Sequence, residues 1–278
     1  MNIITREFGS TGVKVPVIGQ GTWQIKKKAL EALRAGIELG MTHIDTAEMY
    51  TGSEEIVAEA IRGIRKKIFL VSKVLPSNAS YKNTLRACEA SLKRLQTDYL
   101  DVYLLHWWSG SYSIAETMRA MEELVATGKI RYIGVSNLDV DRLKEAQKAL
   151  SREKIVCNQV LYHLRSRGIE NRLLAYCESQ DIALVGYSPF GQSDFPSPTS
   201  KQGQPLATIA RRHGKTLRQV ALNFLTRRKG LFAIPKASTV EHVHENAGGE
   251  GWELTPEDLR LIDAAFPPPD KDAPLDML

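Results

Sequence analysis

Four side chains that can hold or transfer a proton stand at or near the ends of separate apolar segments: Asp45, Tyr50, Lys73 and His106. Lys73 follows the apolar run 68–71, so its ammonium group is expected in a poorly solvated place where it needs an opposite charge. Asp45 is the expected partner. Tyr50 lies five residues after Asp45, and a lysine beside a tyrosine favours the phenolate over the phenol. These residues predict a tyrosine that gives up its proton more readily near neutral pH than an ordinary tyrosine, whose pKa is about 10.

His106 ends another apolar run and is followed by two tryptophans, Trp107 and Trp108. The tryptophans would form an apolar wall with an imidazole donor at its edge, and such a donor can hold a carbonyl oxygen. A single histidine at the end of a strand is also commonly a buried core residue. His43, two residues before Asp45, is predicted to be of that structural kind.

Apolar runs alternate with amphipathic segments along most of the 278 residues. A short hairpin is expected over 6–15, folded about residues 9–12. Apolar residues at three-to-four spacing, as in 85–95, indicate helices between the strands, and eight such units favour a closed barrel over an open sheet. We therefore predict one domain over residues 1–278, a (β/α)8 TIM barrel with an N-terminal β-hairpin. The predicted strands are 17–21, 42–46, 68–73, 99–106, 130–136, 156–160, 182–187 and 232–235.

Seven of these strands end in polar residues, although barrel strands are mostly apolar. In such barrels the C-terminal ends of the strands meet at one rim, where reactive groups collect. One polar strand end is commonplace, whereas seven at one rim favour a functional site. The residues are Asp45, Lys73, His106, Ser136 with Asn137, Gln159, Tyr187 and Lys236.

Two irregular segments are expected to cover the mouth of the barrel. Residues 191–205 are rich in Ser, Pro, Gly and Gln and predict a loop, and the tail from Pro267 carries three successive prolines and is predicted to be extended. Between them a last helix is expected to begin at Thr255, with Pro256 in its first position.

The composition limits the classes of partner. The net charge of +5 could indicate nucleic acid, but basic and acidic residues are interspersed, as in 141–144, which is typical of a solvated surface. No apolar run approaches the roughly 20 residues of a membrane span, and residues 1–9 do not resemble a signal segment. The three cysteines lie far apart, so neither a disulfide framework nor a metal cluster is indicated. We expect a cytoplasmic protein that binds no nucleic acid, membrane or metal.

Short motifs distributed along the chain carry a resemblance to a known family. They are Gly21-Thr22-Trp23; Ile44-Asp45-Thr46-Ala47 followed by Tyr50; Ser72-Lys73; Leu105-His106-Trp107; Gly134-Val135-Ser136-Asn137; Asn158-Gln159-Val160; Tyr187-Ser188-Pro189; and Ile234-Pro235-Lys236. With these motifs in this order, the chain resembles the aldo-keto reductase superfamily over essentially its whole length. It is most similar to prokaryotic members near methylglyoxal reductases and 2,5-diketogluconate reductases, partly through the segment 159–164.

The resemblance implies reduction of an aldehyde or ketone to an alcohol by hydride transfer from NADPH. It implies that Tyr50 is the general acid, tuned by Lys73 and Asp45, and that His106 orients the substrate. It also implies contacts to the cofactor from the strand ends and the loops that follow them. These are Ser136, Asn137 and Gln159 at the carboxamide, Tyr187 on the nicotinamide ring, Ser188, Phe190 and Gly191 along the pyrophosphate, Glu245 and Asn246 at the adenine, and Gly21, Thr22, Trp23, Asp45, Pro189, Ile234 and Ser238 elsewhere.

The segment 236–246 bears on the choice between the two nicotinamide cofactors. The resemblance implies that in relatives this segment binds the adenosine 2′-phosphate. Lys236 is retained, so NADPH is expected to be the better cofactor. Ala237 stands where a serine is common and His242 where an arginine is common, and neither offers the same grip on a phosphate. NADH should therefore also be usable.

Short segments after His106 and after the seventh strand predict an open pocket for small-molecule aldehydes or ketones, lined by Trp23, Trp107 and Trp108. A monomer is expected. Two other functions stay open at this point. One is a Schiff-base lyase in which unprotonated Lys73 attacks a carbonyl, which pairing with Asp45 would oppose. The other is a regulatory subunit that binds a nicotinamide cofactor, for which no added interaction segment is evident.

Overall fold

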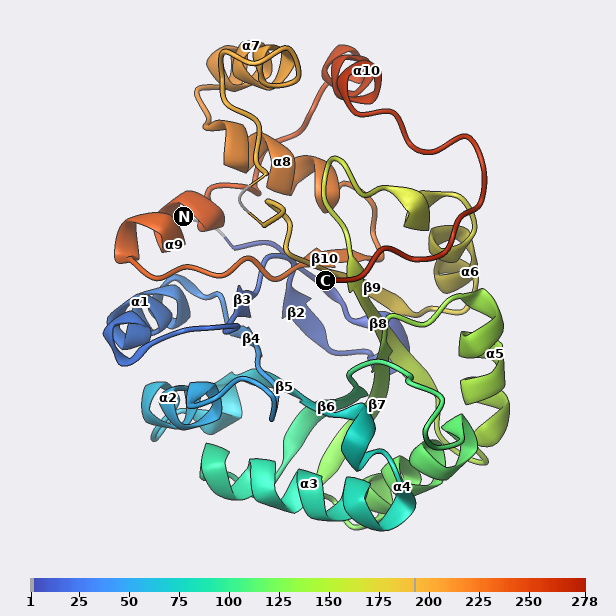
Figure 1. Cartoon of the computed structure of the whole chain (residues 1–278). Helices are drawn as coiled ribbons and strands as arrows, with labels where there is room; N and C mark the ends of the chain where they lie inside the picture. The colour runs from blue at the N-terminus through green and yellow to red at the C-terminus, as the bar shows by residue number, and fades with distance from the viewer. Residues whose placement is uncertain (1–2, 193) are drawn as a thin grey trace.

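Eight parallel strands form the centre of the molecule, each hydrogen-bonded to its neighbours in chain order (Figure 1). The computed structural model describes residues 3–192 and 194–278; Met1, Asn2 and Ser193, which belongs to the predicted loop 191–205, lie outside the described residues. The strands are β3 (Gln20–Gly21), β4 (His43–Asp45), β5 (Phe69–Val74), β6 (Leu100–Leu105), β7 (Ile130–Ser136), β8 (Ile155–Leu161), β9 (Ala183–Tyr187) and β10 (Leu231–Ala233).

The first and last strands close the sheet into a barrel. Parallel bridges pair Ile18 with Ala233 and Gly21 with Lys236. The amide of Ala233 donates to the carbonyl of Val17 at 3.0 Å, and the amide of Gly19 donates to the carbonyl of Ala233 at 2.8 Å. Closure leaves no free sheet edge. The predicted (β/α)8 barrel is therefore confirmed.

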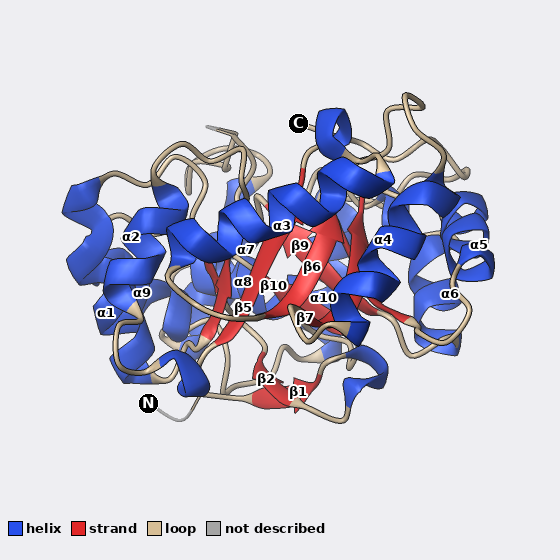
Figure 2. Cartoon of the chain, turned by 90° about the horizontal axis from the view of Figure 1, so that it is seen from below, coloured by secondary structure: helices blue, strands red, loops and turns tan. Residues whose placement is uncertain are grey.

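Helices cover the outside of the barrel (Figures 1 and 2). The strands are consequently mostly apolar on both faces, and every residue of β5, β6 and β8 is buried. The last helix begins where the sequence predicts, with Thr255 as N-cap and Pro256 in the first position. The helices are α1 (Leu30–Leu39), α2 (Ser53–Ala60), α3 (Tyr81–Leu95), α4 (Ile114–Ala126), α5 (Val140–Ala149), α6 (Leu173–Ser179), α7 (Gly203–His213), α8 (Leu217–Leu225), α9 (Val240–Ala247) and α10 (Pro256–Ala265).

Three predicted segments differ from the structure by two or more residues at one end. The strand predicted at 17–21 is assigned only at Gln20–Gly21, because the amide of Val17 bonds to Ile4 beside the hairpin and residues 17–19 otherwise bond to the last strand through a single bridge. The strand predicted at 232–235 ends at Ala233, and Pro235 has no amide hydrogen to extend the ladder. The predicted loop 191–205 is shorter than expected, since α7 begins at Gly203.

An antiparallel hairpin of β1 (Thr5–Glu7) and β2 (Lys14–Pro16) closes the N-terminal end of the barrel, as predicted (Figure 2). Phe8 beside it is fully buried, with its ring centroid 4.9 Å from that of Phe69 and 5.0 Å from that of Phe232. Gly9 has φ +54°, and a Cβ there would lie 2.2 Å from the carbonyl oxygen of Val156. Only glycine fits this turn so close to β8. The hairpin thus plugs this end of the barrel, and the cavity that could admit a ligand opens at the other end.

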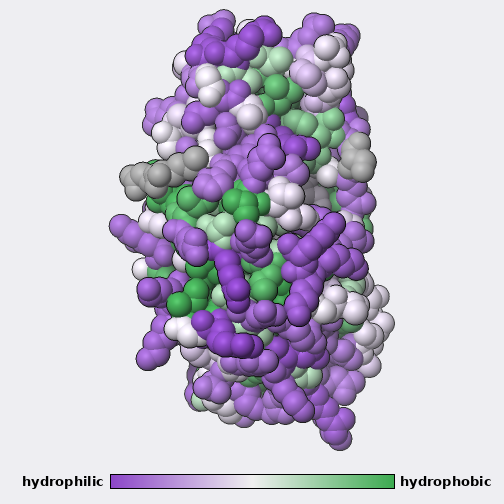
Figure 3. Space-filling model, turned by 90° about the vertical axis from the view of Figure 1, so that its left-hand side faces the viewer, coloured by the Kyte–Doolittle hydropathy of each residue, from purple (hydrophilic) through white to green (hydrophobic). Residues whose placement is uncertain are grey.

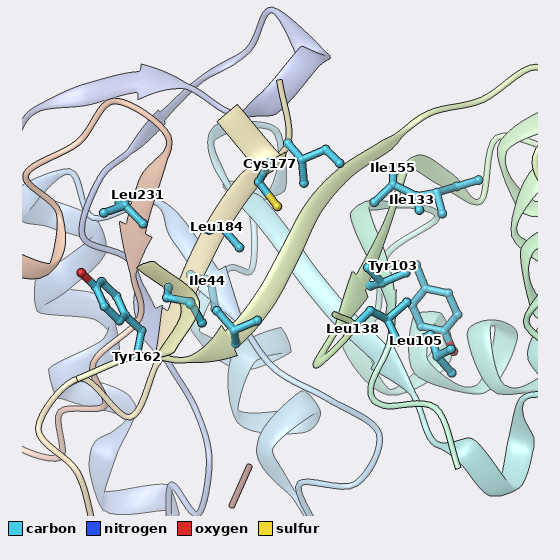
Figure 4. Packing of buried hydrophobic residues seen from close by; sticks show 14 of the residues in the cluster. Ile44, Tyr103, Leu105, Ile133, Leu138, Ile155, Tyr162, Cys177, Leu184 and Leu231 are labelled. Atoms are coloured by element: carbon cyan, nitrogen blue, oxygen red, sulfur yellow. The ribbon is translucent and has the colours of Figure 1, made fainter. Parts of the chain in front are cut away.

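The main core lies between the strands and the helices. Buried residues such as Ile44, Tyr103, Leu138, Tyr162 and Leu184 fill this layer (Figure 4). The three cysteines are buried and unbridged. The outer face over α1 and α9 is largely hydrophilic, with hydrophobic side chains showing between polar ones (Figure 3).

The tail after α10 is extended, as predicted, and crosses the C-terminal end of the barrel (Figure 1). Arg172 forms an ion pair with Asp272 at 2.9 Å, and Asn171 donates to the carbonyl of Pro269 at 3.1 Å. Ser166 donates to Asp276 at 2.7 Å. These contacts hold the end of the chain at the rim on which the polar strand ends lie.

Candidate active site

The four candidate catalytic side chains meet at the C-terminal end of the barrel. Asp45 is the last residue of β4, Lys73 lies near the end of β5, and His106 directly follows β6. Tyr50 stands in the loop between β4 and α2. Parallel register brings these strand ends to one rim, as the sequence predicts.

Lys73 and Asp45 form a buried ion pair. The Nζ atom of Lys73 lies 2.5 Å from Oδ1 of Asp45 and donates a 2.8 Å hydrogen bond to the carbonyl of Thr46. Lys73 has no exposed surface and Asp45 is 1% exposed. Burial lowers the pKa of Lys73, but the charge of Asp45 and the proximity of Tyr50 outweigh it, so the pKa lies above its usual value. Lys73 is therefore a charged ammonium near neutral pH.

Tyr50 lies against both Lys73 and His106. The Nζ atom of Lys73 is 5.1 Å from the centroid of the Tyr50 ring, and the centroids of Tyr50 and His106 are 5.7 Å apart. Burial raises the pKa of Tyr50, the charge of Lys73 lowers it and the charge of Asp45 raises it; the net direction is upward. The sequence-based expectation of a lowered pKa is wrong in this respect, because burial outweighs the lysine. Tyr50 is a neutral phenol that can donate a proton.

His106 is a neutral imidazole. Burial, with a smaller contribution from the charge of Lys73, lowers its pKa to about 3. Its Nδ1 atom is buried and has no hydrogen-bond partner within residues 3–192 and 194–278. His43 is 1% exposed and packs edge-on against Phe8 and Phe69, so the structure places it in the core, as predicted.

A cavity of about 400 Å³ opens above these residues. The strand ends supply most of its polar atoms, and the loops supply aromatic and aliphatic side chains. Lys236 is the one cation among the described residues that line it. The lining residues are Gly21, Thr22, Trp23, Asp45, Met49, Tyr50, His106, Trp107, Ser136, Asn137, Gln159, Tyr187, Ser188, Gln192, Ile234, Lys236, Met277 and Leu278.

A network of polar side chains forms one side of the cavity. Gln159 donates to Oδ2 of Asp45 at 2.7 Å, and Ser136 donates to the carbonyl of Gln159 at 2.8 Å. The hydroxyl of Tyr187 donates to the side-chain oxygen of Asn137 at 3.0 Å. Asn137 has φ +58°, a left-handed conformation that asparagine tolerates better than most residues. These contacts hold amide and hydroxyl groups ready for a polar ligand.

The residues predicted to hold the adenosine end lie beside this cavity. Ala237 and Asn246 line a smaller pocket together with Gly21 and Thr22. The side chain of Thr239 caps α9 by accepting a 3.3 Å hydrogen bond from the amide of His242, whose side chain is exposed. Ser238 precedes this cap.

Glu245 and Phe190 share a neighbour that the sequence did not single out, Arg218 of α8. Its guanidinium lies 3.7 Å from a carboxylate oxygen of Glu245 and 5.5 Å from the ring centroid of Phe190. Pro189 and Gly191 flank Phe190 in the loop after β9. No local sequence pattern could have linked α8 to this loop.

Trp108 is a predicted substrate residue that the structure places outside the cavity. It is not among the described residues that line the 400 Å³ cavity. Its Nε1 atom donates to the carbonyl of Tyr112 at 3.0 Å, and the guanidinium of Arg142 lies 4.0 Å from its ring centroid. The turn after His106 directs Trp107 into the cavity and Trp108 against α5.

Four lining residues were not predicted: Met49, Gln192, Met277 and Leu278. Gln192 belongs to the loop 191–205 and the last two belong to the tail, and both segments were expected to cover the mouth, which was the available signal. Among the described residues no group of three His, Cys, Asp or Glu side chains could hold a metal ion, and no helix is long and apolar enough to cross a membrane.

Comparison with known proteins gives consistent results. The model of the "Aldo/keto reductase family" matches residues 17–266. The chain is 47% identical over 277 residues to methylglyoxal reductase YeaE from Escherichia coli (strain K12), covering 97% of both, and 38% identical over 258 residues to a glyoxal reductase from Bacillus subtilis (strain 168), covering 91% of this chain and 90% of the relative. It is also similar to an aldo/keto reductase from Klebsiella pneumoniae solved with NADP and acetate, with a TM-score of 0.90, 44% identity and 99% coverage of both chains.

Proposed function

Because the chain belongs to the Aldo/keto reductase family, it is an NAD(P)H-dependent oxidoreductase, and we propose that it reduces small aldehydes and ketones to alcohols with NADPH, using Tyr50 as the proton donor. The observation that carries this proposal is a neutral phenol and a neutral imidazole lining one cavity, with the charged ammonium of Lys73 buried beside the phenol. That combination suits a reaction in which negative charge develops on a carbonyl oxygen.

Tyr50 and His106 would hold the carbonyl oxygen of the substrate. The Tyr50 hydroxyl then transfers its proton to that oxygen. The phenolate left behind lies beside the ammonium of Lys73, which is 5.1 Å from the ring centroid. Lys73 therefore stabilises a charge that exists only as the reaction proceeds, and this lowers the barrier without tightening substrate binding. Asp45 keeps Lys73 charged and in place.

The polar side of the cavity fits a nicotinamide. Ser136, Asn137 and Gln159 present amide and hydroxyl groups there, and these groups would hold the carboxamide. Within the described residues no carboxylate forms an ion pair with Lys236, whose ammonium group would hold a phosphate. When bound, the nicotinamide supplies the hydride. The Klebsiella pneumoniae neighbours solved with NADP and with NADPH support this assignment.

The other side of the cavity suits small substrates with apolar groups. Trp23, Met49, Trp107, Met277 and Leu278 form what we call the apolar rim. About 400 Å³ must hold both the nicotinamide and the substrate, and ligand pockets typically span about 300–1,000 Å³. Methylglyoxal and aromatic aldehydes therefore fit better than steroids. The names of YeaE and the Bacillus relative, methylglyoxal reductase and glyoxal reductase, support a small aldehyde as substrate.

A Schiff-base lyase is disfavoured by the raised pKa of Lys73, because a protonated amine cannot attack a carbonyl.

All four catalytic candidates come from one chain, so we propose a monomer with residues 1–278 as one domain.

The proposal is tested by following the loss of NADPH or NADH absorbance with methylglyoxal, an aromatic aldehyde and a bulky steroid ketone. We expect turnover of both aldehydes, with NADPH preferred and the steroid poor. No cofactor oxidation with any aldehyde would contradict the proposed reaction, and a preference for the steroid would contradict the proposed substrate class.

A further inference from the structure

Two glutamate side chains, one in the loop that carries Tyr50 and one directly after it, bond to the strand that carries Lys73 or to the turn after it, in addition to the backbone bonds of the loop to that strand. We call residues 46–52, between β4 and α2, the Tyr50 loop. Glu48 lies on one side of Tyr50 in the chain, and Glu54, in the first turn of α2, lies on the other. Both carboxylates bind β5 or the turn directly after it.

Glu48 binds just beyond Lys73. Its Oε1 atom accepts a 2.6 Å hydrogen bond from the amide of Leu75 and a 3.1 Å bond from the side-chain amide of Asn78. Its Oε2 atom lies 3.2 Å from the same amide nitrogen of Asn78. The carboxylate thus ties the first half of the Tyr50 loop to the end of β5.

Glu54 binds just before Lys73. It is 1% exposed, and its Oε1 atom accepts a 2.7 Å hydrogen bond from the hydroxyl of Ser72. Its Oε2 atom is paired with Nε of Arg94 at 2.6 Å, which compensates the buried charge. Beside it, the hydroxyl of Ser53 donates to the carbonyl of Thr22 at 2.9 Å.

The two bound positions, Ser72 and Leu75, flank Lys73 on both sides. Side chains alternate along a strand, so Ser72 faces α2 and α3 while Lys73 faces into the barrel. Resting on the function proposed above, we propose that Glu48 and Glu54 are positioning residues that set the place of the Tyr50 hydroxyl relative to Lys73 and the substrate. A displacement of about 1 Å of a reacting group can cost about a hundredfold in rate, so the clamps bear directly on proton transfer.

Glu48→Ala is the decisive variant, because Glu48 is less buried than Glu54 and the partners of its carboxylate among the described residues, Leu75 and Asn78, are not predicted substrate or cofactor residues. We expect the single-turnover rate of aldehyde reduction at saturating NADPH to fall about tenfold to a hundredfold. The affinity for NADPH, followed by the fluorescence of the cavity tryptophans, should stay within about twofold of wild type. Since proton transfer becomes slower, the solvent deuterium isotope effect should increase.

Two further variants separate positioning from general loss of stability. Glu48→Gln keeps an oxygen that can accept a hydrogen bond from the amide of Leu75. Its single-turnover rate should therefore recover at least about a third of the difference between Glu48→Ala and wild type. Asp101→Ala is the matched control. Asp101 is 2% exposed and accepts a 2.9 Å hydrogen bond from the amide of Leu70, on the opposite half of β5. It should lower stability while the rate per folded molecule stays within about twofold of wild type.

A Glu48→Ala rate within about twofold of wild type, or a loss matched by Asp101→Ala, would overturn the inference. If wild type reduces aldehydes and Tyr50→Phe does not, either of these Glu48→Ala outcomes removes the positioning role and leaves the proposed function standing. If wild type reduces no aldehyde, or if Tyr50→Phe keeps near-normal activity, the proposed function and this inference both fall.

Discussion

The carboxylate of Asp45 accepts a 2.7 Å hydrogen bond from Gln159 through one oxygen while its other oxygen lies 2.5 Å from the ammonium of Lys73. Asp45 therefore joins β8 to β5 across the interior of the barrel, although Gln159 lies 114 residues further along the chain. In the proposed function, Asp45 thus links Gln159, which would lie beside the carboxamide, to Lys73, which would stabilise the Tyr50 phenolate.

Removing the Tyr50 hydroxyl should abolish most reduction. A general acid contributes about a hundredfold to ten-thousandfold to the rate, so we expect Tyr50→Phe to lose at least about a hundredfold in kcat. NADPH affinity should stay near wild type. Tyr81→Phe serves as control, because Tyr81 is 39% exposed at the start of α3. Near-normal turnover of Tyr50→Phe on a good aldehyde would show that another group donates the proton.

Neutralising Asp45 should destabilise the fold as well as the site. Asp45→Asn leaves the ammonium of Lys73 buried without an opposite charge, and breaking a buried pair costs about 3–5 kcal/mol. Denaturant unfolding at pH 7 measures this loss. Asp272→Asn breaks an exposed pair with Arg172 and should cost at most about 1 kcal/mol. Equal stabilities for the two variants would mean that the buried pair contributes nothing.

Buried neutral histidines should make the protein sensitive to acid. Burial lowers the pKa of His43 to about 4 from a usual 6.5, so its contribution is complete above pH 6.5 and declines as the pH falls towards 4. We expect His43 to account for about 2 kcal/mol of the stability lost between pH 7 and pH 5.

His43→Leu should therefore lose less stability than wild type over the same pH interval, as urea unfolding at the two pH values would show. The exposed His244 provides the control variant His244→Gln, which should follow wild type. A His43→Leu protein with the same acid sensitivity as wild type would rule out this source.

The two adjacent tryptophans should differ in their effect on substrate choice. Trp107 lines the cavity, whereas Trp108 lies beneath Arg142. Trp107→Ala is expected to change the ranking of aldehydes by kcat/KM, by about tenfold or more for aromatic ones. Trp108→Ala should lower stability and leave the ranking unchanged. The reverse pattern would return Trp108 to the substrate pocket that the sequence predicts.

His242 should control the preference between the two cofactors. It is exposed in the first turn of α9, after the Thr239 cap. A charge-assisted hydrogen bond contributes about 1.5–3 kcal/mol, so His242→Arg should raise the affinity ratio of NADPH to NADH by about tenfold or more. His244→Arg, on the same helix, is the matched control. An unchanged ratio in His242→Arg would place the 2′-phosphate elsewhere.

The barrel was predictable because its strands are apolar on both faces and end in polar residues. Pro235 and the early start of α7 at Gly203 moved boundaries by a few residues, since local hydrogen bonding sets such ends.

The candidate catalytic residues were predictable for the same reason, as strand ends meet at one rim. The direction in which the pKa of Tyr50 shifts was not predictable, because it depends on how deeply the surrounding segments bury the phenol. The different positions of Trp107 and Trp108 depend on one turn, and the contacts of Met277 depend on where the tail crosses, neither of which leaves a local pattern.

The path of the tail has a practical consequence for recombinant work. Met277 and Leu278 line the cavity, so an affinity tag appended after Leu278 would begin at the mouth of the pocket and compete with ligands there. The N-terminal hairpin lies at the opposite end of the barrel (Figure 2). A purification handle placed ahead of it would leave the pocket accessible, so kinetic constants from amino- and carboxyl-tagged preparations should differ.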